Sequence, residues 1–252
     1  GQLSGKVDTV TNLPLAINIA FATALVPAIS AAKAKNDRES ATKRTSFSLL
    51  TSMLIGLPCV VGMIVFAQPI LNLLYPKANE GALLLQLISV SVIFSILDQT
   101  INGALQGFGK VMVPATALGI GCLVKLVLNI VLLKIPFFNV YGAAIGSIAC
   151  HAVAFAIVFN VLKKYVKLDL PFNKFVIKPA IATIIMAVCS YTLYLLMDRI
   201  ISGGLATIIA MLFAVVIYLA AVVALKIYNK EDIYMLPKGG KIYEILEKLK
   251  IY

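Results

Sequence analysis

The sequence predicts an all-α integral membrane protein with seven transmembrane helices. Of its 252 residues, 61% are hydrophobic and 13% are charged, and the mean hydropathy is +0.97. A soluble domain has about a quarter of its residues charged. The apolar residues also lie in stretches of roughly 20 residues or more, the length that a helix needs to cross a bilayer. The expected segments are 10–32, 45–72, 81–106, 112–134, 140–163, 177–198 and 204–227.

The first two segments each contain a proline inside the predicted span. Pro14 and Pro58 lack a backbone N–H, so each is expected to kink its helix. The first segment also carries two polar side chains, Asn12 and Asn18. We interpret these as residues that line a cavity, or as partners of neighbouring backbone groups freed by Pro14.

The third segment carries polar side chains at a regular spacing. Asp98, Asn102 and Gln106 recur every four residues, so they share one face of the helix. A charged side chain at the centre of a bilayer costs about 2.5–3.5 kcal/mol on insertion scales. Asp98 therefore requires a partner or a functional role, and we predict that Asp98 and Asn102 line a substrate cavity.

The fourth segment begins near Pro114 and carries Lys125 and Asn129 on one face. Lys125 lies about nine residues, or roughly 13 Å, from the outer end of its helix, too deep for its side chain to reach the membrane surface. It is either a cavity cation for an anionic headgroup or the partner of Asp98 in an ion pair. A hairpin turn at Gly109 would bring Asp98 to nearly the same depth in the membrane as Lys125. The two interpretations are compatible if the pair lines the cavity.

The fifth segment contains the single histidine of the chain, His151. A histidine within a membrane can relay protons, or it can form a hydrogen bond between helices. The same segment carries small residues at a spacing of four, and so does the end of the third segment. Such residues allow helices to approach closely, and they predict two packing stripes. These are Gly142, Gly146, Cys150 and Ala154 in one stripe, and Gly103 and Gly107 in the other.

The last two segments complete a predicted transmembrane lobe at residues 1–228, which is followed by a tail at 229–252. Pro179 stands near the start of the sixth segment, where its missing N–H costs little. In the tail, the apolar residues fall on one helical face, so the tail is expected to lie on the inner membrane surface or to be an ordinary amphipathic cytoplasmic helix. The residues of this face are Ile242, Ile245, Leu246 and Leu249.

The distribution of positive charge predicts the orientation of the chain. Lys and Arg concentrate in cytoplasmic loops of membrane proteins. Seventeen of the 22 Lys and Arg residues lie in loop 33–44, turn 107–111, loop 163–178 and the tail from Lys226. The N-terminus is therefore expected outside and the C-terminus in the cytoplasm. The net charge of +11 then reflects this asymmetry and does not indicate nucleic-acid binding.

The sequence offers no pattern for catalysis, a metal or another cofactor. The four cysteines, at positions 59, 122, 150 and 189, all fall within apolar stretches and lack metal-ligand spacing. The closest acidic pair outside the predicted spans, Asp37 and Glu39, lies among Lys and Arg residues. We therefore expect a protein that is not an enzyme and carries no cofactor.

Several short motifs resemble those of the polysaccharide-transporter branch of the multidrug/oligosaccharidyl-lipid/polysaccharide (MOP) exporter superfamily. The order and spacing of the motifs carry this resemblance, which covers nearly the whole chain. The tail motif is especially similar to that of sporulation members of the branch. The motifs are NLP at 12–14, VPAIS at 26–30, ALQGFGK at 104–110, YGAAIGS at 141–147 and NKEDIYMLPKGGKI at 229–242.

The resemblance implies a fold and a function. Members have about fourteen helices in two pseudo-symmetric lobes around a central cavity, and they work by alternating access. On this basis the present chain would be helices eight to fourteen, the C-terminal lobe of a flippase in the bacterial inner membrane. Its partners would be membrane lipids, a missing N-terminal lobe and a lipid-linked oligosaccharide or peptidoglycan precursor. Because the chain begins at Gly1 and not at Met, we expect a fragment.

One departure and two alternatives accompany this resemblance. In flippases of lipid II, arginines in the cavity are implicated in holding the pyrophosphate, but the first segment has no Arg or Lys between Val7 and Ala32. The missing lobe would then supply such groups. The alternatives are a drug/cation antiporter of the same superfamily and a non-transporting scaffold in cell-envelope or spore assembly.

Overall fold

The computed structural model describes residues 2–76, 81–132, 134, 139–168, 170–201, 203–236 and 239–248. These residues are mostly helical, and seven of their helices are long and apolar enough to cross a membrane. The predicted all-α membrane fold is therefore confirmed. The chain forms two compact units, Gly1–Asp169 and Leu170–Tyr252, and each is described by itself. The sequence did not indicate this division, which falls in the loop between two equally apolar helices.

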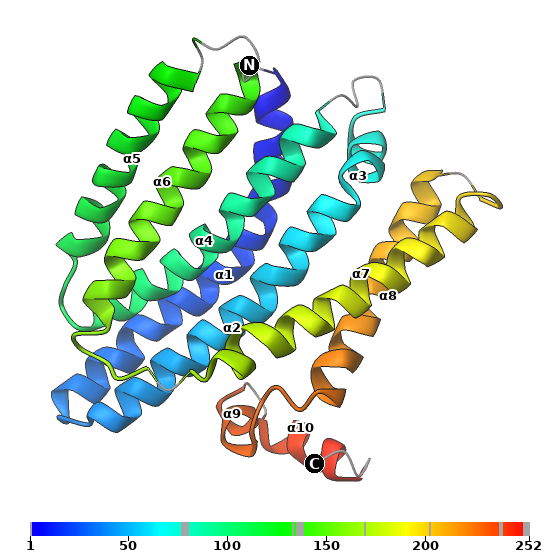
Figure 1. Cartoon of the computed structure of the whole chain (residues 1–252). Coiled ribbons are helices and arrows are strands. Elements are labelled where there is room, and N and C mark those ends of the chain that lie inside the picture. The colour runs from blue at the N-terminus through cyan, green and yellow to red at the C-terminus, as the bar shows by residue number, and fades with distance from the viewer. Residues whose placement is uncertain are drawn as a thin grey trace. The chain divides into compact units, whose positions relative to one another are not determined.

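The first unit is a bundle organised around its fourth helix. Helix α4 packs against α1, α2 and α6, whereas α5 packs mainly against α6 (Figure 1). Helix α6 thus separates most of α5 from α4. The elements are α1 (Gln2–Ala34), α2 (Arg38–Val65), α3 (Ala67–Leu74), α4 (Ala82–Gly107), α5 (Met112–Leu132) and α6 (Asn139–Leu162).

Small residues allow the close contact between α1 and α4. A Cβ atom built on Gly103 would overlap the backbone carbonyl oxygen of Ala22. A Cβ atom on Gly107 would lie 2.6 Å from Cβ of Ile29 and 2.9 Å from the backbone oxygen of Val26. No side chain larger than hydrogen fits at either position, so the predicted packing role of this stripe is confirmed.

The second predicted segment, 45–72, is not one helix. Helix α2 begins earlier, at Arg38, because the side chain of Asp37 caps it by accepting a hydrogen bond of 2.9 Å from the Ser40 amide. It ends at Val65, four residues before Pro69. The ring of a proline clashes with the carbonyl four residues earlier, so the helix breaks there and α3 starts afresh.

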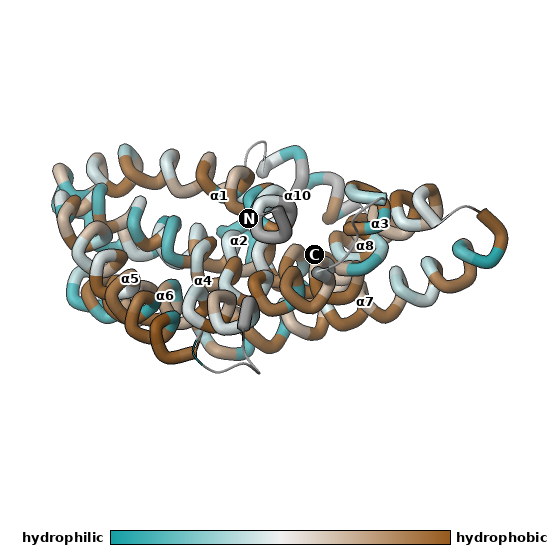
Figure 2. The backbone as a smooth tube through the Cα atoms, turned by 90° about the horizontal axis from the view of Figure 1, so that it is seen from above, coloured by the Kyte–Doolittle hydropathy of each residue, from teal (hydrophilic) through white to brown (hydrophobic). Residues whose placement is uncertain are grey.

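The second unit is a helical hairpin followed by a short helical tail. Most of α7 and α8 is coloured hydrophobic in Figure 2, as expected for helices that cross a membrane. The predicted boundary between lobe and tail, at residue 228, falls between α8 and α9. The elements are a π-helical turn (Asn173–Ile177), α7 (Lys178–Met197), α8 (Gly203–Ala224), α9 (Lys230–Met235) and α10 (Gly239–Lys248).

Polar contacts hold the tail against the start of α7. Lys174 forms a half-buried ion pair of 2.5 Å with Asp232. The carboxylate of Asp232 also accepts a hydrogen bond from the backbone N–H of Asn229 and so caps α9. Lys178 donates to the carbonyl oxygen of Leu225, at 2.9 Å, near the end of α8. These bonds satisfy backbone groups that helix ends leave free.

The last helix, α10, falls in the predicted amphipathic tail. Its Tyr243 stacks on Tyr234 at a centroid distance of 5.5 Å, and the ammonium group of Lys230 lies 4.5 Å from the Tyr243 centroid. Part of the predicted apolar face, namely the side chains of Ile242 and Ile245 and the whole of Leu249, lies outside the described residues. Membrane attachment of the tail stays a prediction.

Candidate functional site

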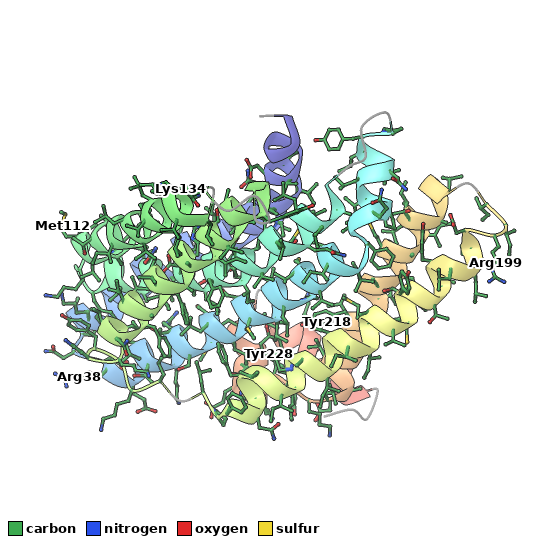
Figure 3. The ribbon with its side chains drawn as sticks, turned by 45° about the horizontal axis from the view of Figure 1, so that its top comes forward. Arg38, Met112, Lys134, Arg199, Tyr218 and Tyr228 are labelled. Atoms are coloured by element: carbon green, nitrogen blue, oxygen red, sulfur yellow. The ribbon has the colours of Figure 1, made fainter. Side chains whose placement is uncertain are left out.

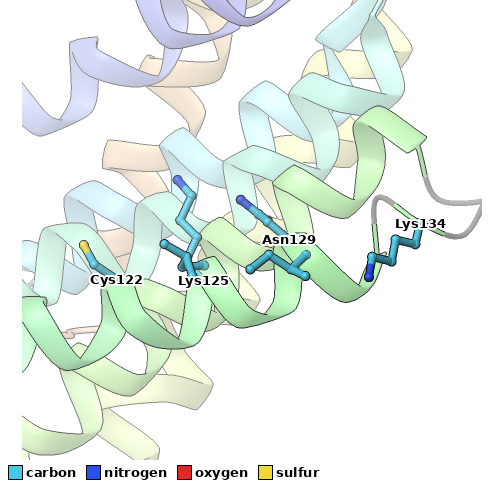
Figure 4. Close-up of a pocket in the computed structure, with 6 residues that line it drawn as sticks. Cys122, Lys125, Asn129 and Lys134 are labelled. Carbon is cyan, nitrogen blue, oxygen red and sulfur yellow. The ribbon is translucent and has the colours of Figure 1, made fainter.

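An open groove runs along one face of α5 within the first unit. Its volume is about 510 Å³, and Figure 4 shows the side chains that line it. Two of them, Lys125 and Asn129, are candidates from the sequence, and both are half-buried. Figure 3 labels Met112 at the start of α5 and Lys134 just past its end. The full set of lining residues is Cys122, Lys125, Leu126, Asn129, Ile130 and Lys134.

The helical period places these residues together. Positions three and four apart lie on one face of a helix, which is how Cys122, Lys125 and Asn129 come to line the same groove. Lys125 is about 10 Å along the axis from the helix end at Leu132, at 1.5 Å per residue. The ends of Lys125 and Asn129 extend from the same side of α5 (Figure 4). The groove therefore presents one cation and one amide at membrane depth.

Glycines set the distance between α5 and α6. Gly121 lies so close to α6 that a Cβ atom there would be 2.5 Å from the carbonyl oxygen of Cys150. A Cβ atom on Gly146 would overlap Oδ1 of Asn129 and lie 3.4 Å from Cγ of Lys125. This contact confirms the packing role predicted for Gly146 and holds the two groove residues against the backbone of α6.

The ion pair expected between Asp98 and Lys125 is not observed. Among the ion pairs of the described residues, none joins these two side chains. The prediction assumed that α5 folds back along α4 after the turn at Gly109, which does have a positive φ of 76°. The glycine contacts instead draw α5 onto α6, so α6 comes between the helices that carry the two charges.

Asp98 and Asn102 lie in the interior of the first unit. Asp98 is 7% exposed, and its Oδ1 has no hydrogen-bond partner. Oδ1 of Asn102 is buried and lacks a partner as well. Phe94, one turn before Asp98 and on the same face, contacts Phe155 of α6 at a centroid distance of 6.0 Å. This face of α4 is therefore directed toward α6 and not toward the groove.

His151 lies on α6 near the groove side chains. It is half-buried, and the charge of Lys125 acts on both His151 and Cys150. The charge of Asp98 also acts on Cys150. Lys125, Asn129 and His151 thus form one polar region where α5 meets α6.

Asn18 has a structural role and does not line a cavity. It is fully buried, and its amide nitrogen donates to the Ile96 carbonyl oxygen at 2.9 Å and to Thr100 Oγ1 at 3.2 Å. Its carbonyl oxygen accepts from Ser52 at 2.8 Å, and Ser52 also bonds Thr100 at 2.6 Å. These bonds join α1, α2 and α4. The backbone group that Asn18 bonds is a carbonyl of α4 and not one freed by Pro14, so the role observed is a third one that the sequence did not indicate.

Asn12 lies on an exposed face of α1 that sequence reasoning did not recognise. Thr9 and Thr23 on this face bond carbonyl oxygens of their own helix, both at 2.9 Å. A recurrence of small and polar residues every three or four positions was the signal that could have revealed it. The small-residue face of α1 comprises Gly5, Thr9, Asn12, Ala16, Ala20, Thr23, Pro27 and Ala31, all exposed.

Sequence reasoning missed the other four residues that line the groove, of which Leu126 and Ile130 are apolar. Cys122 was assigned to packing, although it lies three positions before Lys125 and so on the same face of α5, and Lys134 was counted only as a loop charge, although it lines the groove just past the end of α5. No group of three or more His, Cys, Asp or Glu residues that could hold a metal ion occurs among the residues that the structure describes.

Comparison with known proteins assigns the chain to a family. The sequence model of the MatE family matches residues 5–131, about half of the chain. The chain belongs to the MatE family. This agrees with the MOP resemblance of its motifs. Together with the seven apolar helices, the membership makes the chain a multi-pass membrane protein.

Three curated proteins from Bacillus subtilis (strain 168) are similar to the chain. The uncharacterized membrane protein YabM is 27% identical over 91% of this chain and 44% of its own length. The lipid II flippase MurJ is 27% identical over 60% of this chain and 29% of its own length. Stage V sporulation protein B is 22% identical over 96% of this chain and 46% of its own length. The chain thus spans less than half the length of these relatives.

A solved structure shares the fold. The lipid II flippase MurJ in an inward closed conformation superposes with a TM-score of 0.63 and 17% identity, over 85% of this chain and 46% of the other. The helical arrangement found here is therefore similar to that of part of this flippase structure.

Proposed function

We propose that this chain is one lobe of a flippase for a lipid-linked oligosaccharide or peptidoglycan precursor. The family, and the lipid II flippase among its relatives, support membrane transport as the activity. The coverage of less than half of each relative supports a second lobe in the complete protein. In alternating access, two lobes enclose one central site that opens to either side in turn.

The lysine in the groove of α5 carries this proposal. Lys125 lies within a membrane span, is half-buried and lines an open groove, with no ion pair to Asp98. Polar and charged residues in such positions mark substrate or ion pathways. A phosphate or pyrophosphate headgroup would be an anionic partner for the ammonium group of Lys125. The side-chain amide of Asn129 would donate a hydrogen bond to the same headgroup.

The exposed small-residue face of α1 gives the proposal a second support. Lipid-facing helices are apolar, whereas this face presents Asn12, Thr9 and Thr23 at three levels of the span. Small residues there would let another helix or a polar headgroup approach closely. We assign this face to the cavity side of the lobe, with Asn12 as a lining residue.

The lipid tail of the substrate would remain in the bilayer while the headgroup crosses in the cavity. The proposed location is the bacterial inner membrane, with loop 33–44, loop 164–176 and the tail on the cytoplasmic side. The 17 basic residues on that side support the orientation. No covalent change is required of the substrate, so the proposed activity is not enzymatic.

A reconstituted transport assay tests the function. The complete protein in sealed vesicles should move a fluorescent lipid-linked sugar diphosphate between leaflets, and the 252-residue chain alone should not. Movement of labelled cationic drugs without movement of the lipid-linked sugar would assign a drug/cation antiporter instead. No movement of either class would favour a membrane scaffold.

A further inference from the structure

Two of the four cysteines meet at the contact between α5 and α6. Cys122 lies at the midpoint of α5 and Cys150 lies on α6, and their thiols form a hydrogen bond. Sγ of Cys150 is directed toward α5, because a Cβ atom built on Gly121 would lie 3.2 Å from it. The other two cysteines, Cys59 and Cys189, lie on α2 and α7. Helix packing has therefore brought together two thiols that belong to separate apolar segments of the sequence.

The backbones of α5 and α6 are close enough at this level for a covalent link between side chains. A Cβ atom on Gly121 would be only 2.5 Å from the carbonyl oxygen of Cys150, so the two backbones touch directly beside the thiols. The Cα atoms of a disulfide lie about 4.4–6.8 Å apart. Helix axes are commonly about 8–10 Å apart, so only helices that pack through small residues reach this spacing easily. The glycine contact provides it here.

The two thiols differ in their access to small molecules. Cys122 is exposed and lines the open groove, whereas Cys150 is 4% exposed. Cysteines that respond to oxidants are accessible, and they often stand next to a second cysteine that reacts with the first oxidation product. Cys122 has the position of the first kind of cysteine and Cys150 that of the second.

A cation stands beside the pair, deep in the membrane. Lys125 follows Cys122 by three positions on the same face of α5, and its charge acts on Cys150. Reactive cysteines occupy electropositive and partly exposed surroundings of this kind. Cys122 is about 15 Å from either end of α5, at 1.5 Å per residue. An oxidant that reaches this depth is therefore small and uncharged.

We propose that Cys122 and Cys150 are a reversible redox pair, which hydrogen peroxide oxidises to a disulfide that links α5 to α6. Peroxide first converts the thiol of Cys122 into a sulfenic acid: an S–O bond forms, the O–O bond breaks and one water molecule leaves. The thiol of Cys150 then attacks this sulfur, so that an S–S bond forms, the S–O bond breaks and a second water molecule leaves. Two thiols and one peroxide thus give one disulfide and two water molecules.

The disulfide would change the groove without changing its charge. It would hold α5 against α6 one turn from Lys125 and remove the free thiol of Cys122 from the lining. A small dithiol would reverse it by thiol–disulfide exchange. This role goes beyond the proposed transport activity and does not depend on which substrate is carried.

Thiol counting and mass spectrometry test the pair on the wild-type chain. The purified chain in lipid is treated with hydrogen peroxide, alkylated after denaturation and digested. Two of the four thiols should be lost, and the peptides that contain Cys122 and Cys150 should be joined within one chain. Dithiothreitol should restore all four thiols. If the treated chain keeps four thiols, or if the disulfide includes Cys59 or Cys189, the proposal is overturned.

Substitutions test the separate roles of the two thiols. In Cys150→Ala the sulfenic acid of Cys122 has no thiol to react with, so its adduct with dimedone should accumulate. The matched control, Cys59→Ala on α2, should form the disulfide as the wild type does. A wild-type chain that accumulates as much dimedone adduct as Cys150→Ala would contradict the role of Cys150. The wild-type measurement needs no substitution, so it decides the pairing even if a variant fails to fold.

Discussion

At the scale of single residues, the chain places its membrane-embedded asparagines in different environments. Asn18 is fully buried, and its side-chain amide forms hydrogen bonds with two other helices, whereas Asn12 is exposed on α1. The sequence shows both as asparagines in one apolar segment, six positions apart. Six positions correspond to a rotation of about 240° on a helix, so the two side chains must point in different directions. Which direction faces the core depends on the neighbouring helices.

The network of Asn18 predicts a stability effect. Asn18→Ala would leave Ser52 and Thr100 without their shared partner, and a buried group left unsatisfied costs about 1–3 kcal/mol. We expect a lower thermal unfolding temperature in detergent for this variant. Asn12→Ala, the control on the exposed face, should change stability by less than about 0.5 kcal/mol. Equal effects of the two substitutions would contradict the assignment of Asn18 to the core.

At the scale of elements, the positions of the helices follow closely from the sequence, but their partners do not. The predicted segments 81–106 and 140–163 differ from α4 and α6 by a single residue at each end. The length of an apolar stretch predicts where such a helix begins and ends. The break before Pro69 was missed because it depends on the clash of the proline ring with the carbonyl four residues earlier. The pairing of α5 with α6 arises from glycines on both helices, and the predicted stripe included only those of α6.

The contact between α5 and α6 predicts a selective sensitivity at Gly146. Gly146→Ala places a methyl group onto Oδ1 of Asn129, and such overpacking costs about 1–3 kcal/mol. The control is Gly119→Ala on α5, where a Cβ atom meets nothing within 4 Å. The thermal unfolding temperature should be lowered by Gly146→Ala and not by Gly119→Ala. A Gly146→Ala variant as stable as the Gly119→Ala variant would show that the two helices do not meet at this point.

At the scale of the whole molecule, composition determines the membrane class and the charge pattern predicts the orientation. The division into units at residue 169 was not predictable, because no change of composition marks it. The candidate site was predictable in part. Lys125 and Asn129 share the groove as their spacing indicated, but Asp98 and Asn18 lie elsewhere because tertiary packing decides which helix face becomes buried.

The proposed orientation predicts which loops a membrane-impermeant thiol reagent can reach. In a variant without the native cysteines, Ser40→Cys and Asn173→Cys should remain unlabelled in sealed cells and react after lysis. Arg199→Cys, on the opposite side, should react in intact cells. Rapid labelling of Ser40→Cys or Asn173→Cys from outside would reverse the orientation derived from the basic residues.

The central claim is that the cation in the α5 groove contacts the anionic headgroup of a transported lipid. It is tested most directly by the flipping rate of a fluorescent lipid-linked sugar diphosphate in vesicles that contain the complete protein. Loss of a charged hydrogen bond is worth about 1.5–3 kcal/mol, so Lys125→Met should slow flipping by roughly 10- to 100-fold. Lys125→Arg should retain a large part of the rate, and Lys164→Met, an exposed lysine just after α6, should match the wild type. A Lys125→Met protein that folds and flips the lipid at the wild-type rate would contradict the account.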